Sequence, residues 1–551
     1  MSKRTSFVIA LFSCRLAFAS GGAFAGTIWY VKADAGGQNN GMSWEDAFTE
    51  LQSALAVVES GDEVWVAAGT YLPDYDVNSG EHTLDREGTF QLMNGVEVYG
   101  GFVGGETRRD QRNPNPNTNG TVLSGDLLGD DGPNFENNDE NSYHVTTGSG
   151  TDENAVLDGF TVKAGNADER PDNDGGAGMY NNAGSPTVGN CTFSGNWAYE
   201  GGGMHNDSFS HPTLTNCTFT DNSASAENGG GGMCNFHSSP TLTDCTFNSN
   251  SSAVRGGGMY NGWDSNPALT DCAFSGNSAK RDGGGVANYY DCWPTLVNCT
   301  FSGNSAEKDG GGMDSNYECN PTLTNCTFSG NSANRDGGGM ANYLRCEPKL
   351  TNCILWGNMD QGGQGEFAQI HGGTPVIKYS CIQGCQTHCA RPRDHNIGDD
   401  PRFVTGPVGD FYLSQRAAGQ PKNSPCVDTG SDTAKNLGLN QYTTRTDEAG
   451  DQDIVDMGYH YPISGVNCDL IKRLKVNCKG KPDKFKIKAT VKSDLGEGAE
   501  LTLILDGSDE QVVTTEKSGK AKAKWRKVEP GDHEVCIVEC PDICDDTSCK
   551  P

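Results

Sequence analysis

A block of about 27 residues repeats through the middle of the chain, and this period constrains the fold more than any other feature. Its clearest copies read PTLVNCTFSGNSAEKDGGGM and PTLTNCTFSGNSANRDGGGM. A fixed period of this size is typical of solenoids, whose repeats stack because no single repeat can bury its apolar face alone. One cysteine marks the same position in seven copies, at spacings of 26 to 28 residues: Cys191, Cys217, Cys245, Cys272, Cys299, Cys326 and Cys353.

The apolar positions within one copy indicate short strands. Cys326 and Phe328 are two residues apart, so on a strand they share a face. Leu323 lies three residues before the cysteine, so it shares their face only if Asn325 forms a one-residue corner. Such a corner needs a left-handed backbone conformation, which asparagine tolerates. Glycine triplets in most copies argue against the alternative, an α-solenoid. The sequence therefore predicts a right-handed parallel β-helix, with neighbouring coils about 4.8 Å apart.

Three columns of polar residues recur at the corners of the predicted coils, where stacked asparagines can form hydrogen-bonded ladders along the axis. The first column precedes the cysteine and comprises Asn190, Asn216, Asp244, Asp271, Asn298, Asn325 and Asn352. The second follows the phenylalanine and comprises Asn196, Asn222, Asn250, Asn277, Asn304, Asn331 and Asn358. The third follows the glycine triplet and comprises Asn206, Asn235, Asn261, Asn288, Ser315 and Asn342. Leucine, cysteine, phenylalanine and methionine would fill the interior.

These motifs resemble those of known families. Phe-x-x-Asn followed by Gly-Gly-Gly-Met resembles the paired motifs of bacterial polymorphic outer-membrane protein repeats, although that family has alanine or isoleucine where this chain has glycine or methionine. The segment YVKADAGGQNNGMSWEDAFTELQSAL resembles the first coils of secreted bacterial proteins of the pectin-lyase-like superfamily, and DMGYHYP at Asp456 to Pro462 resembles their closing motif. The resemblance implies a β-helix over about 28–462. It implies little about activity, because one fold hosts many functions.

The chain divides into three predicted segments. Residues 1–25 resemble a secretory signal peptide, with Lys3 and Arg4 before an apolar run and a cleavage site near Ala25. Residues 26–462 form the predicted β-helix, with regular coils over about 185–358. Residues 463–551 alternate apolar and polar side chains, which predicts a small antiparallel β-sandwich. No other apolar run is long enough to span a bilayer, so we expect a secreted or cell-surface bacterial protein.

The net charge of −31 is concentrated in the predicted β-helix, because residues 463–551 hold 16 basic and 16 acidic side chains. The negative electrostatic field of so many acidic side chains disfavours nucleic acid as a partner. Solubility of a large exported surface is one interpretation of the charge, and calcium binding is the alternative.

The 22 cysteines fall into classes. The cysteines of the repeat column are expected to be buried free thiols, and Cys292, Cys319 and Cys346 form a second column nearer a loop. The C-terminal set predicts disulfides in an exported domain: Cys468, Cys478, Cys536, Cys540, Cys544 and Cys549. A zinc site made by the last four is the alternative. Histidine is sparse, and no histidine cluster suggests a transition metal.

Two acidic loops are candidate calcium sites. Asp168, Asp172 and Asp174 lie in DERPDNDGG, and Asp451 and Asp453 lie in DEAGDQDIVD. Calcium prefers several flexible oxygen ligands, which both loops could offer. Neither loop matches an EF-hand, and plain acidic loops are the alternative.

No catalytic residue can be assigned from the sequence. Gly-Asp-Asp occurs at 129–131 and 398–400 and resembles one polygalacturonase motif, but the companion motifs of that family are missing. The repeats also place basic residues beside Asp282, Asp309 and Asp336, which we interpret as a solvated ladder at a coil edge. A retaining or inverting carboxylate pair requires a defined separation that a sequence does not supply.

The sequence favours an exported β-helix repeat protein that binds a surface glycan or a protein without catalysis. Near-identical coils make a long polar face that suits such contacts. One alternative is a polysaccharide lyase or glycoside hydrolase of the pectin-lyase-like superfamily, and another is a structural spacer. No cofactor is required by this hypothesis, although calcium is compatible with it.

Overall fold

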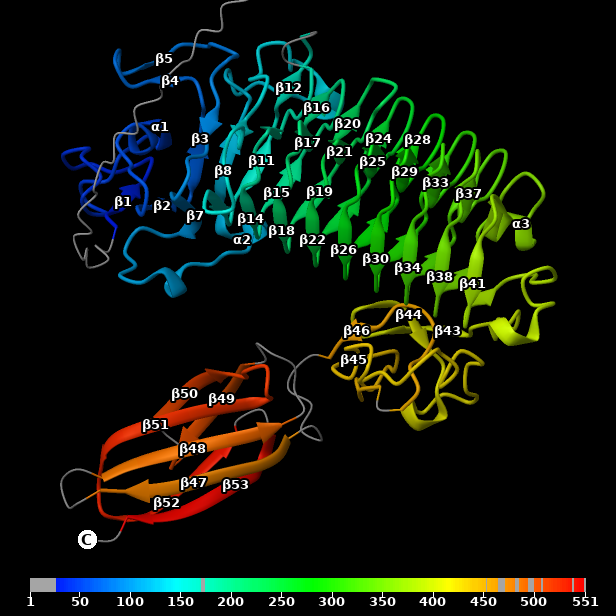
Figure 1. Ribbon diagram of the computed structural model, residues 1–551. Coiled ribbons are helices and arrows are strands. Elements are labelled where there is room, and N and C mark those ends of the chain that lie inside the picture. The colour runs from blue at the N-terminus through cyan, green and yellow to red at the C-terminus, as the bar shows by residue number, and fades with distance from the viewer. Residues whose placement is uncertain are drawn as a thin grey trace, which may run out of the picture.

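The computed structural model describes residues 26–169, 174–451, 453–463, 471–480, 485–493, 500–506, 509–537 and 540–549. The predicted signal peptide at 1–25 lies outside these residues, and so does Asp172. Figure 1 shows a row of coils stacked along one axis, with each strand lying beside its equivalent in the next coil. These coils form the predicted parallel β-helix.

Three long parallel sheets run along the coil stack (Figure 1). The first sheet comprises β1 (Ile28–Val31), β2 (Glu63–Ala67), β7 (Glu97–Phe102), β10 (Val156–Asp158), β14 (Thr187–Gly189), β18 (Thr213–Thr215), β22 (Thr241–Thr243), β26 (Ala268–Thr270), β30 (Thr295–Val297), β34 (Thr322–Thr324), β38 (Lys349–Thr351) and β41 (Val376–Lys378). The second comprises β3 (Gly69–Tyr71), β8 (Thr121–Ser124), β11 (Thr161–Lys163), β15 (Thr192–Ser194), β19 (Thr218–Thr220), β23 (Thr246–Asn248), β27 (Ala273–Ser275), β31 (Thr300–Ser302), β35 (Thr327–Ser329), β39 (Ile354–Trp356) and β42 (Cys381–Ile382).

The third sheet is the one that carries the candidate site. It comprises β6 (Phe90–Gln91), β9 (Thr146–Thr147), β13 (Met179–Asn182), β17 (Met204–Asp207), β21 (Met233–Phe236), β25 (Met259–Gly262), β29 (Val286–Tyr289), β33 (Met313–Asn316), β37 (Met340–Asn342) and β40 (Ile370–Gly372). A shorter fourth sheet precedes the third in the seven coils from β12 to β36. Its strands are β12 (Asn166–Ala167), β16 (Trp197–Ala198), β20 (Ser223–Ala224), β24 (Ser251–Ser252), β28 (Ser278–Ala279), β32 (Ser305–Ala306) and β36 (Ser332–Ala333).

A few short elements decorate the stack. Among the described residues the α-helices are α1 (Leu51–Leu55), α2 (Pro116–Asn119) and α3 (Glu366–Gln369), and short 3-10 helices occur at Arg109–Gln111, Pro133–Phe135, Pro392–Asp394 and Arg416–Ala418. The strand β4 (Tyr75–Asp76) pairs with β5 (Glu81–His82). The described residues contain no helix that is long and apolar enough to span a membrane.

The predicted corner at Asn325 is confirmed. Its backbone is left-handed, with φ of 53°, so Leu323, Cys326 and Phe328 all turn inward and are fully buried. The phenylalanine rings stack from coil to coil, with centroids 4.8 Å apart for Phe274 and Phe301 and 4.2 Å apart for Phe301 and Phe328. The repeat-column cysteines are buried free thiols, and they extend the same apolar core.

The second asparagine column forms a buried ladder. Nδ2 of Asn304 donates to Oδ1 of Asn331 at 2.8 Å and to the carbonyl oxygen of Phe274 at 2.9 Å, and the Asn304 amide N–H donates to the same Asn331 oxygen at 3.0 Å. Each side chain therefore satisfies polar groups of its own coil and of its neighbours, which is what burial of an amide requires.

The end of the β-helix differs from the prediction. The parallel sheets end at Ile382, whereas coils were expected through 462. The following chain forms the antiparallel pairs β43 (Phe403–Gly406) with β44 (Gly409–Leu413) and β45 (Tyr442–Thr443) with β46 (Tyr461–Pro462).

These two pairs belong to a lobe of residues 403–451 and 453–463, here called the return lobe, which lies against the last coils in Figure 1. Nδ2 of Asn325 donates to the carbonyl oxygen of Asp456 at 3.3 Å, and the Tyr459 N–H donates to Oγ1 of Thr327 at 3.0 Å. The segment lacks the Leu-Cys-Phe spacing that continues a coil, and its backbone groups instead bond to the asparagine corner.

The C-terminal segment is an antiparallel β-sandwich, as predicted. One sheet contains β47 (Ile471–Lys479), β48 (Phe485–Ser493) and β51 (Lys520–Val528), and the other contains β50 (Asp509–Thr514), β49 (Glu500–Leu505), β52 (Gly531–Ile537) and β53 (Cys540–Cys549). Both sheets contribute to one core that includes Ile487, Leu503 and Trp525. Disulfides join Cys478 to Cys549 and Cys536 to Cys544, which excludes the four-cysteine zinc alternative.

Candidate functional site

The outer face of the third sheet carries the side chains in which the coils differ most. The methionine of each coil points into the core, so the next residue points outward. That outward column reads Tyr180, His205, Cys234, Tyr260, Ala287, Asp314, Ala341 and His371. His205, Cys234, Tyr260 and Asp314 are nevertheless buried. The loops that enter the third sheet therefore fold over its outer face and enclose these side chains.

A pocket of about 320 Å³ opens between these loops and the ends of the third-sheet strands. Here it is called the charged pocket, and its lining is Arg255, Arg281, Asp282, Tyr289, Lys308, Asp309, Asn316, Tyr317, Arg335, Tyr343 and Leu344. Four cations, two carboxylates and three phenol rings therefore share one small cavity. Such a mixture of charged groups and ring faces suits a polar, many-hydroxyl ligand.

The carboxylates of the charged pocket are held by their neighbours. Tyr289 donates its hydroxyl to Oδ2 of Asp282 at 2.9 Å, and Nε of Arg281 lies 3.2 Å from the same oxygen. Nε of Arg335 donates to Oδ1 of Asp309 at 2.7 Å. The Arg255 guanidinium lies 4.2 Å from the Tyr289 ring centroid in a cation–π contact.

The expected solvated ladder of charges is therefore wrong for two of its three acidic members. Asp282 and Asp309 are 4% and 2% exposed, because the loops fold inward over the sheet instead of projecting into solvent. Their buried charges are compensated by the arginines on the rim of the pocket.

Asp314 lies beneath the charged pocket and is fully buried. Burial raises the pKa of its carboxyl well above the usual range, and the negative charges of Asp282 and Asp309 raise it further. Its Oδ1 has no hydrogen-bond partner among the described residues. Protonation of this carboxyl is therefore favoured relative to an exposed aspartate.

A row of rings borders the charged pocket along the axis. It consists of His237, Trp263, Tyr290 and Tyr317, one per coil, and is called the aromatic stripe here. The centroids of Trp263 and Tyr290 lie 4.4 Å apart, and those of Tyr290 and Tyr317 lie 4.7 Å apart. Trp263 is 46% exposed and Tyr317 is 43% exposed. A second groove of about 430 Å³ lies on the other side of Tyr290 and Tyr317.

The stripe is held in an unfavourable backbone conformation. Every member is left-handed, with φ of 47° at His237, 56° at Trp263, 67° at Tyr290 and 55° at Tyr317. A left-handed residue with a side chain costs roughly 1–2 kcal/mol relative to the right-handed form, and glycine would remove this cost. Bulky rings in four successive coils at such a corner are more consistent with ligand contact than with stability.

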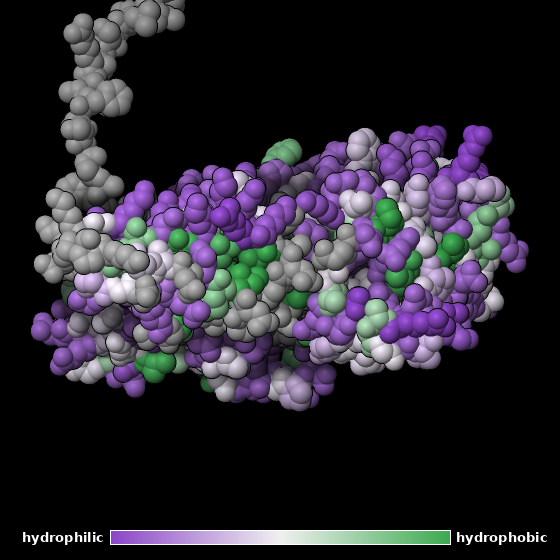
Figure 2. Space-filling view, turned by 90° about the horizontal axis from the view of Figure 1, so that it is seen from below, coloured by the Kyte–Doolittle hydropathy of each residue, from purple (hydrophilic) through white to green (hydrophobic). Residues whose placement is uncertain are grey.

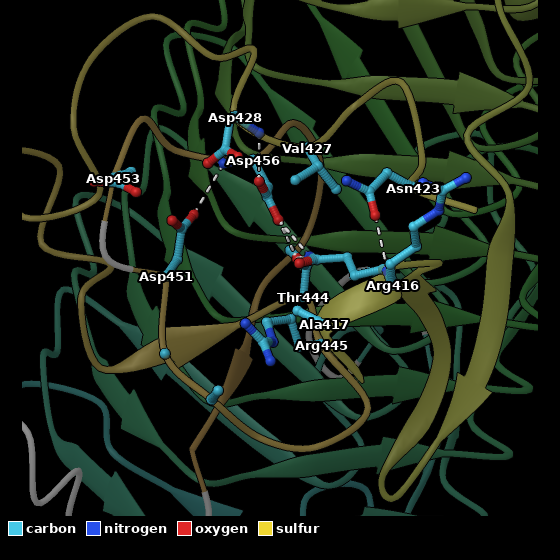
Figure 3. A pocket seen from close by; sticks show the side chains of 13 residues that line it. Arg416, Ala417, Asn423, Val427, Asp428, Thr444, Arg445, Asp451, Asp453 and Asp456 are labelled. Carbon is cyan, nitrogen blue, oxygen red and sulfur yellow. Dashed lines mark hydrogen bonds between the residues drawn. The ribbon is translucent and has the colours of Figure 1, made fainter. Parts of the chain in front are cut away.

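The predicted calcium loop around Asp451 forms a separate pocket of about 410 Å³ in the return lobe (Figure 3). Carboxylate oxygens of Asp428, Asp451 and Asp456 lie within 4.8 Å of one another, and Asp453 lines the same pocket without joining the group. Burial and the charge of Asp451 raise the pKa of Asp456 to about 6. Asp428 lies before the DEAGDQDIVD segment in the sequence, so the acidic motif of that segment alone did not identify it.

Of the other predicted calcium residues, Asp168 and Asp174 lie within the described residues and Asp172 lies outside them. Asp168 forms an ion pair with Arg86 at 2.7 Å. The backbone carbonyl of Asp174 accepts a hydrogen bond from the Glu200 N–H at 3.0 Å. Asp130, from the first Gly-Asp-Asp segment, groups instead with Asp126 and Glu140.

Sequence reasoning missed the outward column and the aromatic stripe. One signal could have found both: they occupy the positions one and four residues after the repeated methionine, where the coils disagree although the rest of the repeat is nearly constant. Inward positions repeat because each must stack on its copy, whereas outward positions are free to vary with function.

One family model agrees with this architecture over part of the chain, and three solved structures show a distant likeness. A family model described as a right-handed beta helix region matches residues 227–377. Among solved structures, pectate lyase Pel9A is 13% identical with a TM-score of 0.48, covering 78% of this chain and 96% of that one. A rhamnogalacturonan lyase is 13% identical with a TM-score of 0.33, covering 72% and 96%. Tailspike protein gp49 from Acinetobacter baumannii bacteriophage Fri1, described as a capsular polysaccharide depolymerase, is 12% identical with a TM-score of 0.28, covering 95% and 86%.

A comparison with curated proteins gives no match. The observed coils and the match to residues 227–377 lead to one assignment. The chain carries a right-handed parallel β-helix.

Proposed function

We propose that the protein is an exported or cell-surface β-helix protein that binds a polysaccharide along the aromatic stripe and the charged pocket. The observation that carries the proposal is the stacked row of half-exposed rings at Trp263, Tyr290 and Tyr317. Sugar rings pack their C–H faces on aromatic rings, and their hydroxyls need charged and polar groups close by. The charged pocket supplies those groups beside Tyr317.

Binding is favoured over catalysis because the ionised carboxylates of the charged pocket are already engaged. Asp282 is bonded to Tyr289 and lies beside Arg281, and Asp309 is bonded to Arg335. Repetition along the stripe suits several modest contacts with one chain, whose affinities combine through effective concentration. Figure 2 shows one face of the molecule, seen from below the view of Figure 1, and this face is mostly hydrophilic.

The test is binding of the purified protein to a panel of acidic and neutral polysaccharides. We expect Trp263→Ala and Tyr317→Ala each to weaken binding roughly fivefold to tenfold, since truncating an aromatic anchor costs about 1 kcal/mol or more. Met42→Ala is the control, because Met42 is 60% exposed and lies between β1 and α1, at the start of the coil stack. Equal binding by all three variants and wild type would refute the proposal.

Cleavage of a glycosidic bond is the second candidate, and Asp314 is the observation that favours it. A carboxyl whose pKa is raised by burial and by two neighbouring aspartates is suited to general acid catalysis. The full burial of Asp314 places it out of reach of a ligand in the charged pocket, which is why binding stands first. Release of new reducing or unsaturated ends by wild type, abolished in Asp314→Asn, would establish this candidate instead.

A further inference from the structure

Three different metal-binding side chains meet on the outer face of the third sheet, in the coils just before the one that carries Arg255 of the charged pocket. Glu200 lies in the loop that enters β17, His205 lies on β17, and Cys234 lies on β21 in register with His205. One ligand atom from each lies within 4.8 Å of the other two. Ligand atoms around tetrahedral zinc are roughly 3–4 Å apart, so small side-chain rotations would complete the geometry.

We propose that Glu200, His205 and Cys234 bind a divalent transition metal of the zinc type. The donor set of one thiolate, one imidazole and one carboxylate suits zinc, whereas calcium and magnesium prefer oxygen ligands alone. Three protein ligands leave a fourth position for water or for a ligand group. This site is distinct from the proposed glycan surface and does not depend on it.

His205 points independently to a missing ligand. Its ring is 6% exposed, and its Nδ1 has no hydrogen-bond partner among the described residues. Buried ring nitrogens in folded proteins are normally paired, and an unpaired one requires an explanation. Coordination of the imidazole by a metal would supply that explanation. Coordination would also fix the His205 ring between Tyr180 and Phe236, the two rings that it contacts.

The surroundings of Cys234 favour a cation. The thiol is fully buried, and burial raises its pKa well above the usual range, with the charges of Glu200, Asp207 and Asp174 raising it further. A bound divalent cation would offset the same negative field, and metal binding would release the thiol proton.

Asn228 supports Glu200 directly. Its Nδ2 donates to Oε1 of Glu200 at 3.2 Å, whereas the Cys234 thiol donates to the backbone carbonyl oxygen of Asn228 at 3.3 Å, a bond that loss of the thiol proton on metal binding would break. Tyr260 donates its hydroxyl to Oδ1 of the same residue at 3.2 Å. Residues that orient ligands in this way typically contribute 10- to 100-fold to metal affinity.

The repeat provides variants that keep the fold. Ala287 and Ala341 occupy the same outward register as Cys234, so Cys234→Ala and His205→Ala place a residue that this sheet already accommodates. His237→Ala is the matched control, because His237 is exposed and lies outside the cluster. Circular dichroism of the metal-free variants checks that each remains folded.

The experiment is titration of metal-free protein with Co²⁺, followed by displacement with Zn²⁺. We expect a thiolate-to-cobalt charge-transfer band that saturates at one equivalent per chain and disappears on adding Zn²⁺. The band should be lost in Cys234→Ala, lost or shifted in His205→Ala, and unchanged in His237→Ala. In Asn228→Ala the band should remain, but half-saturation should require about 10- to 100-fold more Co²⁺. No band in wild type, or an unchanged band in Cys234→Ala, would overturn the assignment.

Discussion

Asn298 and His460 form a reciprocal pair of hydrogen bonds across 162 residues of sequence. Nδ2 of Asn298 donates to the His460 carbonyl oxygen at 2.7 Å, and the His460 N–H donates to Oδ1 of Asn298 at 2.7 Å. Asn298 belongs to the first corner column, so one repeat position serves both the coil and the return lobe. The β-helix is therefore closed along this edge by chain that lies beyond its last coil.

Asn298→Ala should loosen the return lobe. The substitution removes both bonds and leaves buried backbone groups of His460 unpaired, which costs about 1–3 kcal/mol. Hydrogen exchange should speed up over residues 453–463 and stay unchanged in the first coils. Asn216→Ala is the control, because Asn216 occupies the same column with an exposed side chain that bonds only to Asn190 in the structure. Equal exchange in both variants would contradict the role assigned to Asn298.

Phe301→Ala should destabilise the coils on both sides of it. The ring is fully buried between Phe274 and Phe328, and truncation of a buried aromatic side chain costs about 3–5 kcal/mol. Chemical unfolding followed by far-ultraviolet circular dichroism measures the loss. Phe209→Ala, in which a 72% exposed ring is removed, should leave the unfolding midpoint nearly unchanged. Similar midpoints for the two variants would show that the ring stack does not stabilise the coils.

The contrast between Phe301 and Asp314 shows which parts of the structure the sequence could predict. Phe301 was predicted as core because its column repeats at a fixed period and stacking requires copies of one shape. Asp314 lies on the outer face, and its burial depends on how loops fold over the sheet. Asn298 was predicted as a corner, but its partner His460 could not be, because a contact across 162 residues leaves no local pattern.

Glu366 should make stability depend on pH in the acidic range. Burial opposes its ionisation, but backbone N–H donors of Thr387 and His388, the His388 side chain and the Gln386 N–H together lower its pKa from 4.5 to about 2. A carboxyl with a lowered folded-state pKa stabilises the fold above its unfolded pKa and loses that contribution as pH falls.

This contribution is about 3 kcal/mol at neutral pH and should decline between pH 4.5 and 2. Glu366→Gln should therefore be less stable than wild type at neutral pH, and the gap should shrink as pH falls through that window. Unfolding free energies measured across the window test this, with the exposed Glu347→Gln as the control. A gap that stays constant with pH would rule out ionised Glu366 as its cause.

Calcium at the pocket of Asp428, Asp451 and Asp456 remains a prediction. Because the pKa of Asp456 is about 6, a bound cation would displace its proton, and affinity should fall as pH drops below 6. Calorimetric titration of wild type, Asp451→Asn and the control Asp168→Asn measures this. We expect binding to be lost in Asp451→Asn alone. Loss in Asp168→Asn, or equal affinity in all three proteins, would be inconsistent with calcium at this pocket.

The dependence of affinity on oligosaccharide length tests the proposed glycan surface most directly. The rings of the aromatic stripe recur once per coil, so an oligosaccharide that reaches more of them should bind more tightly until it covers Trp263, Tyr290 and Tyr317. Calorimetry with a length series of the best-bound polysaccharide should show affinity rising and then levelling off in wild type, without any shortening of the oligosaccharides. The triple variant Trp263→Ala, Tyr290→Ala, Tyr317→Ala should bind weakly at every length. A length dependence that survives in the triple variant, or cleavage of the oligosaccharides by wild type, would contradict the account.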